Sequence, residues 1–463
     1  MKQSRKWLAL CSIMLGTFVG TLNSSSINIA NPVLASEYSL TMGQVQWVTT
    51  IYFIFLTSLM LLMGRIGDRV GSHKVYILGS FIFTFGSLAC GLAHAFLFLL
   101  FARVIQALGA AMMLATGMGL LTTIFPQKQR GTVLGVNVLM VGLGSMLGPS
   151  LGGLILSFAS WQMIFLINVP IALVISVAST FFVRSPVSPD HDAPPLDKVG
   201  ALMLMGIVAA LIIGLSGGFV GSYWFILILV FLIPVFVLYE RKQPQPLIDI
   251  SILRIRRFSL GNLIAFFSYS ANMIVAFQLP FLLQGLWNMP VASAGLLIAV
   301  SSLCMAVSGP IAGFISDRIG ALRLMPVALM LLCAALTLAF FIPSEPLVPL
   351  FVVYLILIGT GMGMLNTPNN SDIMTSAPRQ FAGYASGFVS TNRNLAFCVG
   401  TAASAGIFSM SQGLFETTLP ATDAYLYAFR CIIGIALVLM LISLSICLYL
   451  RRKESVNKKP PAV

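Results

Sequence analysis

The chain has 463 residues; 58% of them are hydrophobic, only 8% are charged, and the mean hydropathy is +0.98. No soluble domain can bury so much apolar surface, so the composition indicates a protein that crosses a membrane many times. The net charge of +13 does not indicate nucleic-acid binding, because the basic residues lie in short loops between apolar segments. The seven cysteines lie inside those segments without paired spacing, which predicts free thiols and no metal site.

Fourteen apolar segments follow one another along the chain, each close to the length of about 20 residues that a spanning helix needs. The first follows a short basic leader and is followed by further spans, which argues for an uncleaved first helix rather than a removed signal peptide. We expect the spanning helices near residues 8–30, 44–63, 75–93, 98–124, 132–155, 161–183, 198–218, 223–239, 258–283, 293–314, 324–342, 350–376, 384–408 and 425–450.

The basic residues are distributed unequally over the two sides of these segments. Alternate loops, counted from the N-terminus, hold 23 of the 26 lysines and arginines, whereas the loops on the opposite side hold none. The other three, Arg103, Arg393 and Arg430, fall within the segments. Because lysine and arginine accumulate in cytoplasmic loops, this asymmetry predicts that both termini are cytoplasmic.

A short charged loop occurs twice, at 64–74 and at 313–323, with a constant offset of 249 residues. Two copies in register indicate two repeated halves, and the offset leaves about 60 residues for an inserted helical hairpin. We therefore predict an all-α membrane protein with an N-terminal six-helix bundle (1–183), a linker with two additional transmembrane helices (184–256), and a C-terminal six-helix bundle with a cytoplasmic tail (257–463). The matched positions are Gly64, Asp68, Arg69, Gly71 and Lys74 in the first copy and Gly313, Asp317, Arg318, Gly320 and Arg323 in the second.

Three further motifs lie within the predicted helices: Phe101–Gly109 in the fourth, Gly144–Gly153 in the fifth and Ile164–Pro170 in the sixth. With the repeated loop, they resemble the motifs of the major facilitator superfamily, and most of all those of its fourteen-span drug:proton antiporter family. The resemblance covers essentially the whole chain. It implies a major facilitator fold and a multidrug-type exporter of small amphipathic compounds that works by alternating access and serves antibiotic resistance.

The resemblance also implies roles for these motifs. The repeated loop would be a state switch that latches the two bundles in one conformation and releases them in the other. The fifth-helix motif is the exporter-type motif, in which the glycines allow a close helix crossing and the proline lets the helix bend. The family further implies a monomer in the plasma (inner) membrane of a bacterium, protons as coupling ion, and no cofactor. The exporter-type motif comprises Gly144, Gly148, Pro149, Gly152 and Gly153.

One departure from the family pattern concerns proton coupling. The first segment has Asn23 where the family usually has an aspartate, and asparagine does not titrate. Of the 13 acidic residues, only Asp372 falls plainly inside a segment. Because charged groups inside a membrane are costly and usually functional, the coupling candidates are Arg103, Asp372 and Arg393. Polar residues that could line a substrate cavity are Asn23, Ser25, Asn28, Asn137, Gln278, Asn366, Asn369 and Asn392.

The missing aspartate leaves an uncoupled facilitator or importer as an alternative, and a membrane sensor on a transporter scaffold is another. We do not expect an enzyme, because nothing in the sequence resembles a phosphate-binding loop, a metal cluster or a nucleophile–base pair. A cation in the membrane needs acidic groups around it, and the segments contain very few. We therefore expect neutral, zwitterionic or anionic substrates rather than dications.

Overall fold

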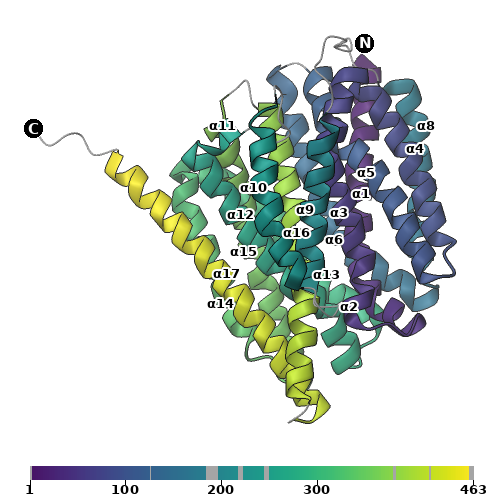
Figure 1. The fold of residues 1–463 in the computed structure, drawn as a ribbon, viewed down its shortest axis with the longest axis vertical. Coiled ribbons are helices and arrows are strands. Elements are labelled where there is room, and N and C mark those ends of the chain that lie inside the picture. Colours follow the sequence, from purple (N-terminus) through teal and green to yellow (C-terminus); the bar gives the residue numbers. More distant parts are fainter. Residues whose placement is uncertain are drawn as a thin grey trace, which may run out of the picture. The chain divides into compact units, whose positions relative to one another are not determined.

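The computed structural model describes residues 3–125, 127–183, 197–216, 223–243, 250–378, 382–416 and 419–457, and these ranges are helical with no strand (Figure 1). Within them, twelve segments are long and apolar enough to cross a membrane, and α9 and α10 add two shorter apolar helices. The predicted all-α fold with fourteen membrane helices is confirmed. The helices are α1 (Gln3–Glu37), α3 (Trp47–Val70), α4 (Ser72–Gly91), α5 (Phe96–Ile124), α6 (Gln127–Phe158), α8 (Asn168–Phe182), α9 (Lys198–Ser216), α10 (Tyr223–Glu240), α12 (Arg256–Phe281), α13 (Val291–Ile319), α14 (Ala321–Ala339), α15 (Val348–Ser376), α16 (Ala382–Phe415) and α17 (Ala421–Asn457).

Several helices begin or end at residues that differ from the predicted limits of the spans. α1 and α17 continue beyond the apolar segments at both ends, because apolar composition marks the membrane-embedded part while helical hydrogen bonding continues into polar residues. The sixth span is divided at Ile167 into the short α7 (Met163–Leu166) and α8. The remaining short elements are α2 (Met42–Val45), α11 (Ile250–Leu253) and the π-helical turn η1 (Leu282–Leu286).

The chain forms two compact units. The first holds residues 1–248 together with 283–299, and the second holds 249–282 together with 300–463. In the first unit α1 packs against α6 and α8, α5 packs against α3 and α4, and the α9–α10 pair packs beside α3. In the second unit α12 packs against α15, α16 and α17, and α14 against α15 and α17. Much of the predicted linker, 184–196 and 244–249, lies outside the described residues.

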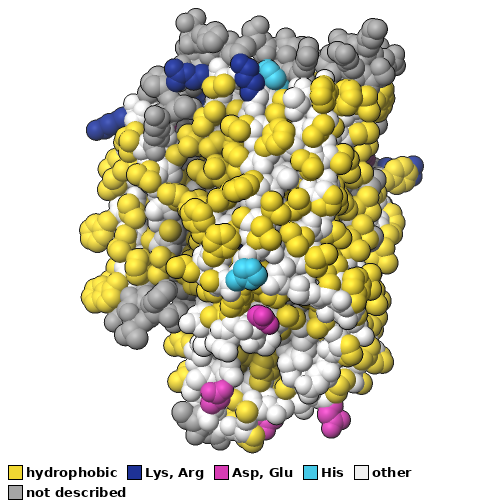
Figure 2. Space-filling view, turned by 90° about the vertical axis from the view of Figure 1, so that its right-hand side faces the viewer, with side chains coloured by type: hydrophobic (Ala, Val, Ile, Leu, Met, Phe, Trp, Pro, Cys, Tyr) yellow, Lys and Arg dark blue, Asp and Glu magenta, His cyan; other side chains and the backbone are white. Residues whose placement is uncertain are grey.

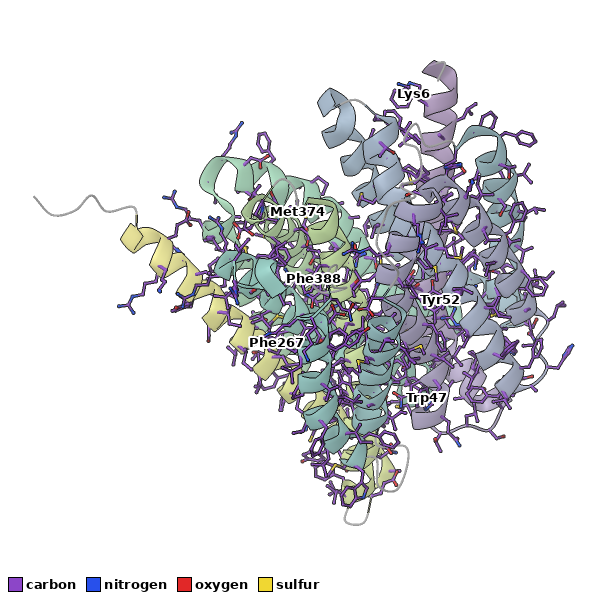
Figure 3. The ribbon with its side chains drawn as sticks, turned by 45° about the horizontal axis from the view of Figure 1, so that its top comes forward. Lys6, Trp47, Tyr52, Phe267, Met374 and Phe388 are labelled. Atoms are coloured by element: carbon purple, nitrogen blue, oxygen red, sulfur yellow. The ribbon has the colours of Figure 1, made fainter. Side chains whose placement is uncertain are left out.

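Apolar side chains form both the interior and the outer surface of these units. Inside the second unit, Phe258 and Ile373 form a buried cluster against which Met374 and Phe388 pack (Figure 3). On the face in Figure 2, apolar side chains cover most of the surface between the two ends of the molecule. Phe85 of α4 and Phe181 of α8 are among the exposed large apolar side chains. A protein surface with so many exposed large apolar side chains fits a hydrocarbon surrounding.

The two copies of the repeated loop have the same backbone conformation. Gly71 separates α3 from α4 with φ of 109°, and Gly320 separates α13 from α14 with φ of 92°. These angles are accessible to glycine and strained for residues with a Cβ atom. The shared turn explains why glycine occupies both positions, and it agrees with the repeat that the constant offset predicts.

Candidate functional site

The residues of the predicted state switch lie at the ends of helices. Arg69 and Lys74 are exposed on either side of the Gly71 turn, and the side chain of Asp68 lies outside the described part of α3. In the second copy, Asp317 and Arg318 are exposed in the last turns of α13. The Arg318 guanidinium carbon lies 4.1 Å from the centroid of the Phe314 ring. The latch role of these residues stays a prediction.

The glycines of the repeated loop differ in how closely other helices approach them. A Cβ atom built on Gly64 would meet no heavy atom within 4 Å among the described residues, and one on Gly313 would lie 3.1 Å from Thr367 Cγ2. A Cβ atom on Gly67 would lie 2.8 Å from Thr116 Cγ2 of α5. Close helix packing at this end of α3 therefore involves Gly67, which the sequence reasoning did not single out.

The exporter-type motif forms a close crossing between α6 and α1. A Cβ atom built on Gly144 would come within 2.7 Å of the Phe18 carbonyl oxygen, and one on Gly148 within 2.9 Å of the Ser26 nitrogen. One on Gly152 would lie 2.7 Å from Ile29 Cγ2. The glycine stripe thus faces α1 along its whole length, and it leaves no room for side chains.

A hydrogen bond to α1 and a glycine on another face of α6 add to this packing. Ser25 donates to the Gly144 carbonyl oxygen at 3.0 Å, which joins α1 to α6. Gly153 points elsewhere: a Cβ atom there would lie 2.8 Å from the Val291 carbonyl oxygen and 3.1 Å from the Gly295 Cα atom at the start of α13. α6 continues through Pro149 without interruption. The motif therefore packs two faces of one helix closely within the first unit.

A polar cluster surrounds Arg103, and we name it the Arg103 cluster: Arg103, Gln106, Asn23, Asn168 and Tyr52. Arg103 has no exposed surface. Its Nε donates to the Val48 carbonyl oxygen at 2.9 Å and its Nη1 to Gln106 Oε1 at 2.7 Å. Its guanidinium carbon lies 4.2 Å from the centroid of the Tyr52 ring, a cation–π arrangement.

Amide groups connect the rest of the Arg103 cluster. Gln106 Nε2 donates to Asn23 Oδ1 at 3.2 Å and to the Ser87 hydroxyl at 2.8 Å. Asn168 Nδ2 approaches the same Asn23 oxygen at 3.4 Å. α1, α4, α5 and α8 thus each contribute a polar side chain to one buried network. Only the Arg103–Gln106 pair, three residues apart on one helix, has a direct signal in the sequence.

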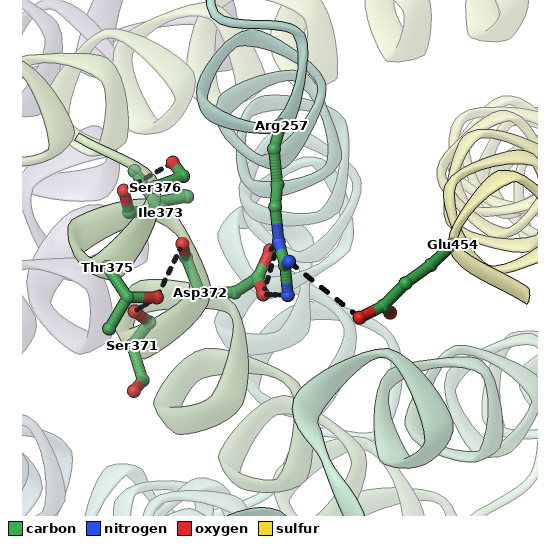
Figure 4. A network of polar contacts seen from close by, with 7 residues as sticks. All are labelled: Arg257, Ser371, Asp372, Ile373, Thr375, Ser376 and Glu454. Carbon is green, nitrogen blue, oxygen red and sulfur yellow. Dashed lines mark hydrogen bonds and ion pairs between the residues drawn. The ribbon is translucent and has the colours of Figure 1, made fainter. Parts of the chain in front are cut away.

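Asp372 pairs with an arginine that the sequence reasoning counted among the loop charges. Asp372 on α15 is 3% exposed and accepts from Arg257 Nε at 2.9 Å through Oδ1 and 3.0 Å through Oδ2, with Nη2 also bonded to Oδ1 (Figure 4). Glu454 Oε1 of α17 lies 3.9 Å from Arg257 Nη1. The ion pair therefore connects α12, α15 and α17. The third coupling candidate, Arg393, is half-buried and interacts with the Tyr269 hydroxyl.

The cavity candidates divide between the units, and several of them form helix–helix hydrogen bonds. Thr17 donates to Asn137 Oδ1 at 2.9 Å, Asn369 donates to the Gly261 carbonyl oxygen at 3.1 Å, and Asn392 donates to the Asn262 carbonyl oxygen at 2.9 Å. Gln278 is fully buried, whereas Asn28 and Asn366 are half-buried. The first unit holds Asn23, Ser25, Asn28 and Asn137, and the second holds Gln278, Asn366, Asn369 and Asn392.

An all-α protein whose described residues form twelve long apolar helices that bury charged and amide groups has the architecture of a polytopic membrane protein. Residues 13–401 match the Major Facilitator Superfamily, and the chain belongs to this superfamily of transporters rather than to an enzyme family. A crystal structure of a bacterial homologue of the human lysosomal transporter Spinster, inward-facing and unoccupied, has the same fold, with a TM-score of 0.70, 16% identity and full coverage of both chains.

Several curated relatives are similar over most of the chain. The riboflavin transporter RibZ of Clostridioides difficile is 35% identical over 454 residues, 98% of this chain and 99% of that protein. The multidrug resistance protein Stp of Mycobacterium tuberculosis is 28% identical over 85% of this chain and 74% of its own length. The tetracenomycin C resistance and export protein of Streptomyces glaucescens is 25% identical over 86% of this chain and 75% of its own length. The resemblance to the superfamily is confirmed, and the drug:proton antiporter assignment stays a prediction.

Proposed function

We propose that this protein carries riboflavin across the plasma membrane of a bacterium by alternating access. The observation that carries the proposal is the similarity to the riboflavin transporter, which extends over nearly the full length of both chains at 35% identity. The relatives named for drug export are 25–28% identical and cover 85–86% of the chain. Full-length similarity without extra segments supports a shared substrate class more strongly than partial similarity does.

The charges of the described residues support a neutral substrate such as riboflavin. A cationic substrate in the membrane needs a carboxylate, because hydrocarbon offers it no solvation. The carboxylate of Asp372, the one acid that the sequence places plainly inside a span, is already bonded to Arg257 through both oxygens. Side-chain amides, by contrast, are abundant, and they offer both donors and acceptors to the carbonyl, imide and hydroxyl groups of riboflavin.

Proton-coupled efflux of amphipathic compounds is the second candidate function. Two observations favour it: the close α1–α6 crossing built from the exporter-type motif, and the similarity to two relatives named for resistance or export. An uncoupled facilitator or importer would use the same fold without a proton site. A sensor would bind its ligand without moving it.

Flux measurements in proteoliposomes test the proposal. Purified protein should mediate saturable riboflavin counterflow, and excess unlabelled riboflavin should compete. A panel of an anionic flavin, neutral drugs, a monocation and a dication, measured with and without an imposed pH gradient, separates the candidates. Drug flux driven by the gradient without riboflavin flux would replace the proposal with the efflux function. Riboflavin binding without any flux would indicate a sensor.

The matched controls come from one pair of glycines. Gly148→Leu should abolish the flux, because the α1–α6 crossing has no room for a side chain, and Gly206→Ala on α9 should preserve it, because the position is open. Liposomes without protein give the leakage rate, which is subtracted from every flux.

A further inference from the structure

Arg103 has more hydrogen-bond donors than its surroundings accept. Its guanidinium group is fully buried, and an arginine carries five N–H donors. Nε bonds to the Val48 carbonyl oxygen and Nη1 to Gln106 Oε1. Nη2 has no hydrogen-bond partner among the residues that the structure describes. A fully buried charged nitrogen without an acceptor is costly, so its environment requires an explanation.

No carboxylate of residues 1–183 lies near this charge. Residues 1–183 contain two acidic residues, Glu37 and Asp68. Glu37 follows Asn23 by fourteen residues along α1, which is about 21 Å of helix, and Asp68 follows Tyr52 by sixteen residues along α3, which is about 24 Å. Among residues 1–183, the charge of Arg103 therefore faces amide and hydroxyl groups, aromatic rings, the Cys90 thiol and backbone dipoles.

Two neighbours of Arg103 add further donors. Asn23 Oδ1 accepts from both Gln106 and Asn168, which fixes the orientation of this amide. Its Nδ2 donor has no acceptor at hydrogen-bond geometry among the described residues. The Tyr52 hydroxyl oxygen lies beside the side chains of Asn23 and Ser24, which interact with it, and its own proton has no acceptor among the described residues. The free donors of Arg103 on α5 and Tyr52 on α3, with the Asn23 amide of α1 beside them, thus occur in one buried cluster around a positive charge.

We infer that Arg103, Asn23 and Tyr52 bind a monovalent anion inside the first unit. The anion would accept from Arg103 Nη2, from Asn23 Nδ2 and from the Tyr52 hydroxyl, and its charge would compensate the buried guanidinium. A free halide and the carboxylate of an organic solute share this chemistry. The inference does not depend on riboflavin as substrate, because binding is measurable on the protein alone.

The experiment measures the thermal unfolding midpoint of the purified protein in detergent while chloride replaces gluconate at constant ionic strength. Chloride is the probe, and gluconate serves as an anion too bulky for a buried site. A bound anion stabilises the folded state by mass action, so the midpoint should rise saturably by roughly 2–5 °C up to about 200 mM chloride. A third arm with formate separates a halide site from a carboxylate site: a response to either anion supports the inference.

Two variants and one control make the test specific. Arg103→Gln removes the positive charge, and Asn23→Asp places a tethered carboxylate beside it, so both should abolish the chloride response. Asn23→Asp keeps the test decisive if Arg103→Gln does not fold. Asn262→Asp, an equivalent change at a buried asparagine of the second unit, should retain the response. The inference is overturned if neither chloride nor formate shifts the wild-type midpoint. It is equally overturned if Asn23→Asp responds as the wild type does, because the anion then binds elsewhere.

Discussion

The two units compensate a buried charge in different ways. Arg103 in the first unit is completely buried, and its partners are a carbonyl oxygen, an amide oxygen and an aromatic ring. Asp372 in the second unit is also buried, but it forms a two-pronged ion pair with Arg257, whose side chain is 43% exposed. A charge with an opposite charge and access to water can relax when its surroundings move. A charge held by dipoles alone depends on the geometry of every neighbour.

The helix crossings of the two units also differ, in the number of glycines at the contact. α6 approaches α1 through glycines, and it continues as one helix through Pro149, which has no backbone N–H to donate. In the second unit α16 contacts α12 at Gly400, but hydroxyl groups also join these helices: Ser404 donates to the Ile274 carbonyl oxygen at 2.6 Å and Ser270 to that of Ala396 at 3.2 Å. Hydroxyl groups join the helices at both crossings, since Ser25 and Thr17 of α1 also bond to α6. The crossings differ in that α6 meets α1 at three glycines, whereas α16 meets α12 at one. We expect the first unit to be the more sensitive to substitution.

The largest expected effect is that of Gly148→Leu. The added side chain would overlap Ser25 and the backbone of Ser26, so α1 and α6 must separate. Overpacking of this kind costs on the order of 3 kcal/mol, and transport should fall below detection. Flux in proteoliposomes and the yield of folded protein measure it, with Gly206→Ala as the control. Wild-type flux in Gly148→Leu would show that the crossing tolerates a gap and that close fit is not its role.

Arg103→Lys should have the next largest effect, and Arg257→Lys is its counterpart in the second unit. Lysine cannot donate to Val48 and Gln106 from one planar group, so transport should fall about tenfold, which corresponds to about 1.4 kcal/mol. Arg257→Lys keeps a charge beside Asp372 in a partly exposed place, so it should lose no more than about twofold. Equal losses in both variants would contradict the difference between the two sites.

The sequence predicts the helices well because the membrane imposes a simple rule on composition. Runs of apolar residues gave all fourteen helices, and the glycine spacing in 144–153 indicated a close crossing. The partners of the charged groups were not predictable, because they come from distant parts of the chain: 115 residues separate Arg257 from Asp372, and 145 separate Asn168 from Asn23. A single sequence carries no signal for such pairs, whereas the Arg103–Gln106 contact follows from helical spacing.

A smaller effect is expected for the Asp372–Arg257 pair. Asp372→Asn and Arg257→Gln should each lower the unfolding midpoint by about 2–4 °C, and the double variant should lower it no further, since both remove the same interaction. The coupling free energy should be only about 1 kcal/mol, because the exposed side of the pair is screened by water. Asp372→Asn also tests the coupling candidate. Loss of pH-driven flux with intact downhill exchange would assign Asp372 a role in proton coupling beyond this structural one.

The last prediction concerns the repeat that makes the two units comparable, and its readout is labelling rather than activity. If the halves are related by the constant offset, the loops at Lys74 and Arg323 lie on the same side of the membrane. The charge asymmetry places that side in the cytoplasm. Single cysteines at these exposed positions, in a background with the native cysteines replaced, should react with an impermeant thiol reagent only after permeabilisation. Single cysteines at the exposed Glu37 and Glu345 should react in intact cells. If Lys74→Cys and Arg323→Cys were labelled from opposite sides, the halves would have opposite orientations and the positions compared above would not be equivalent.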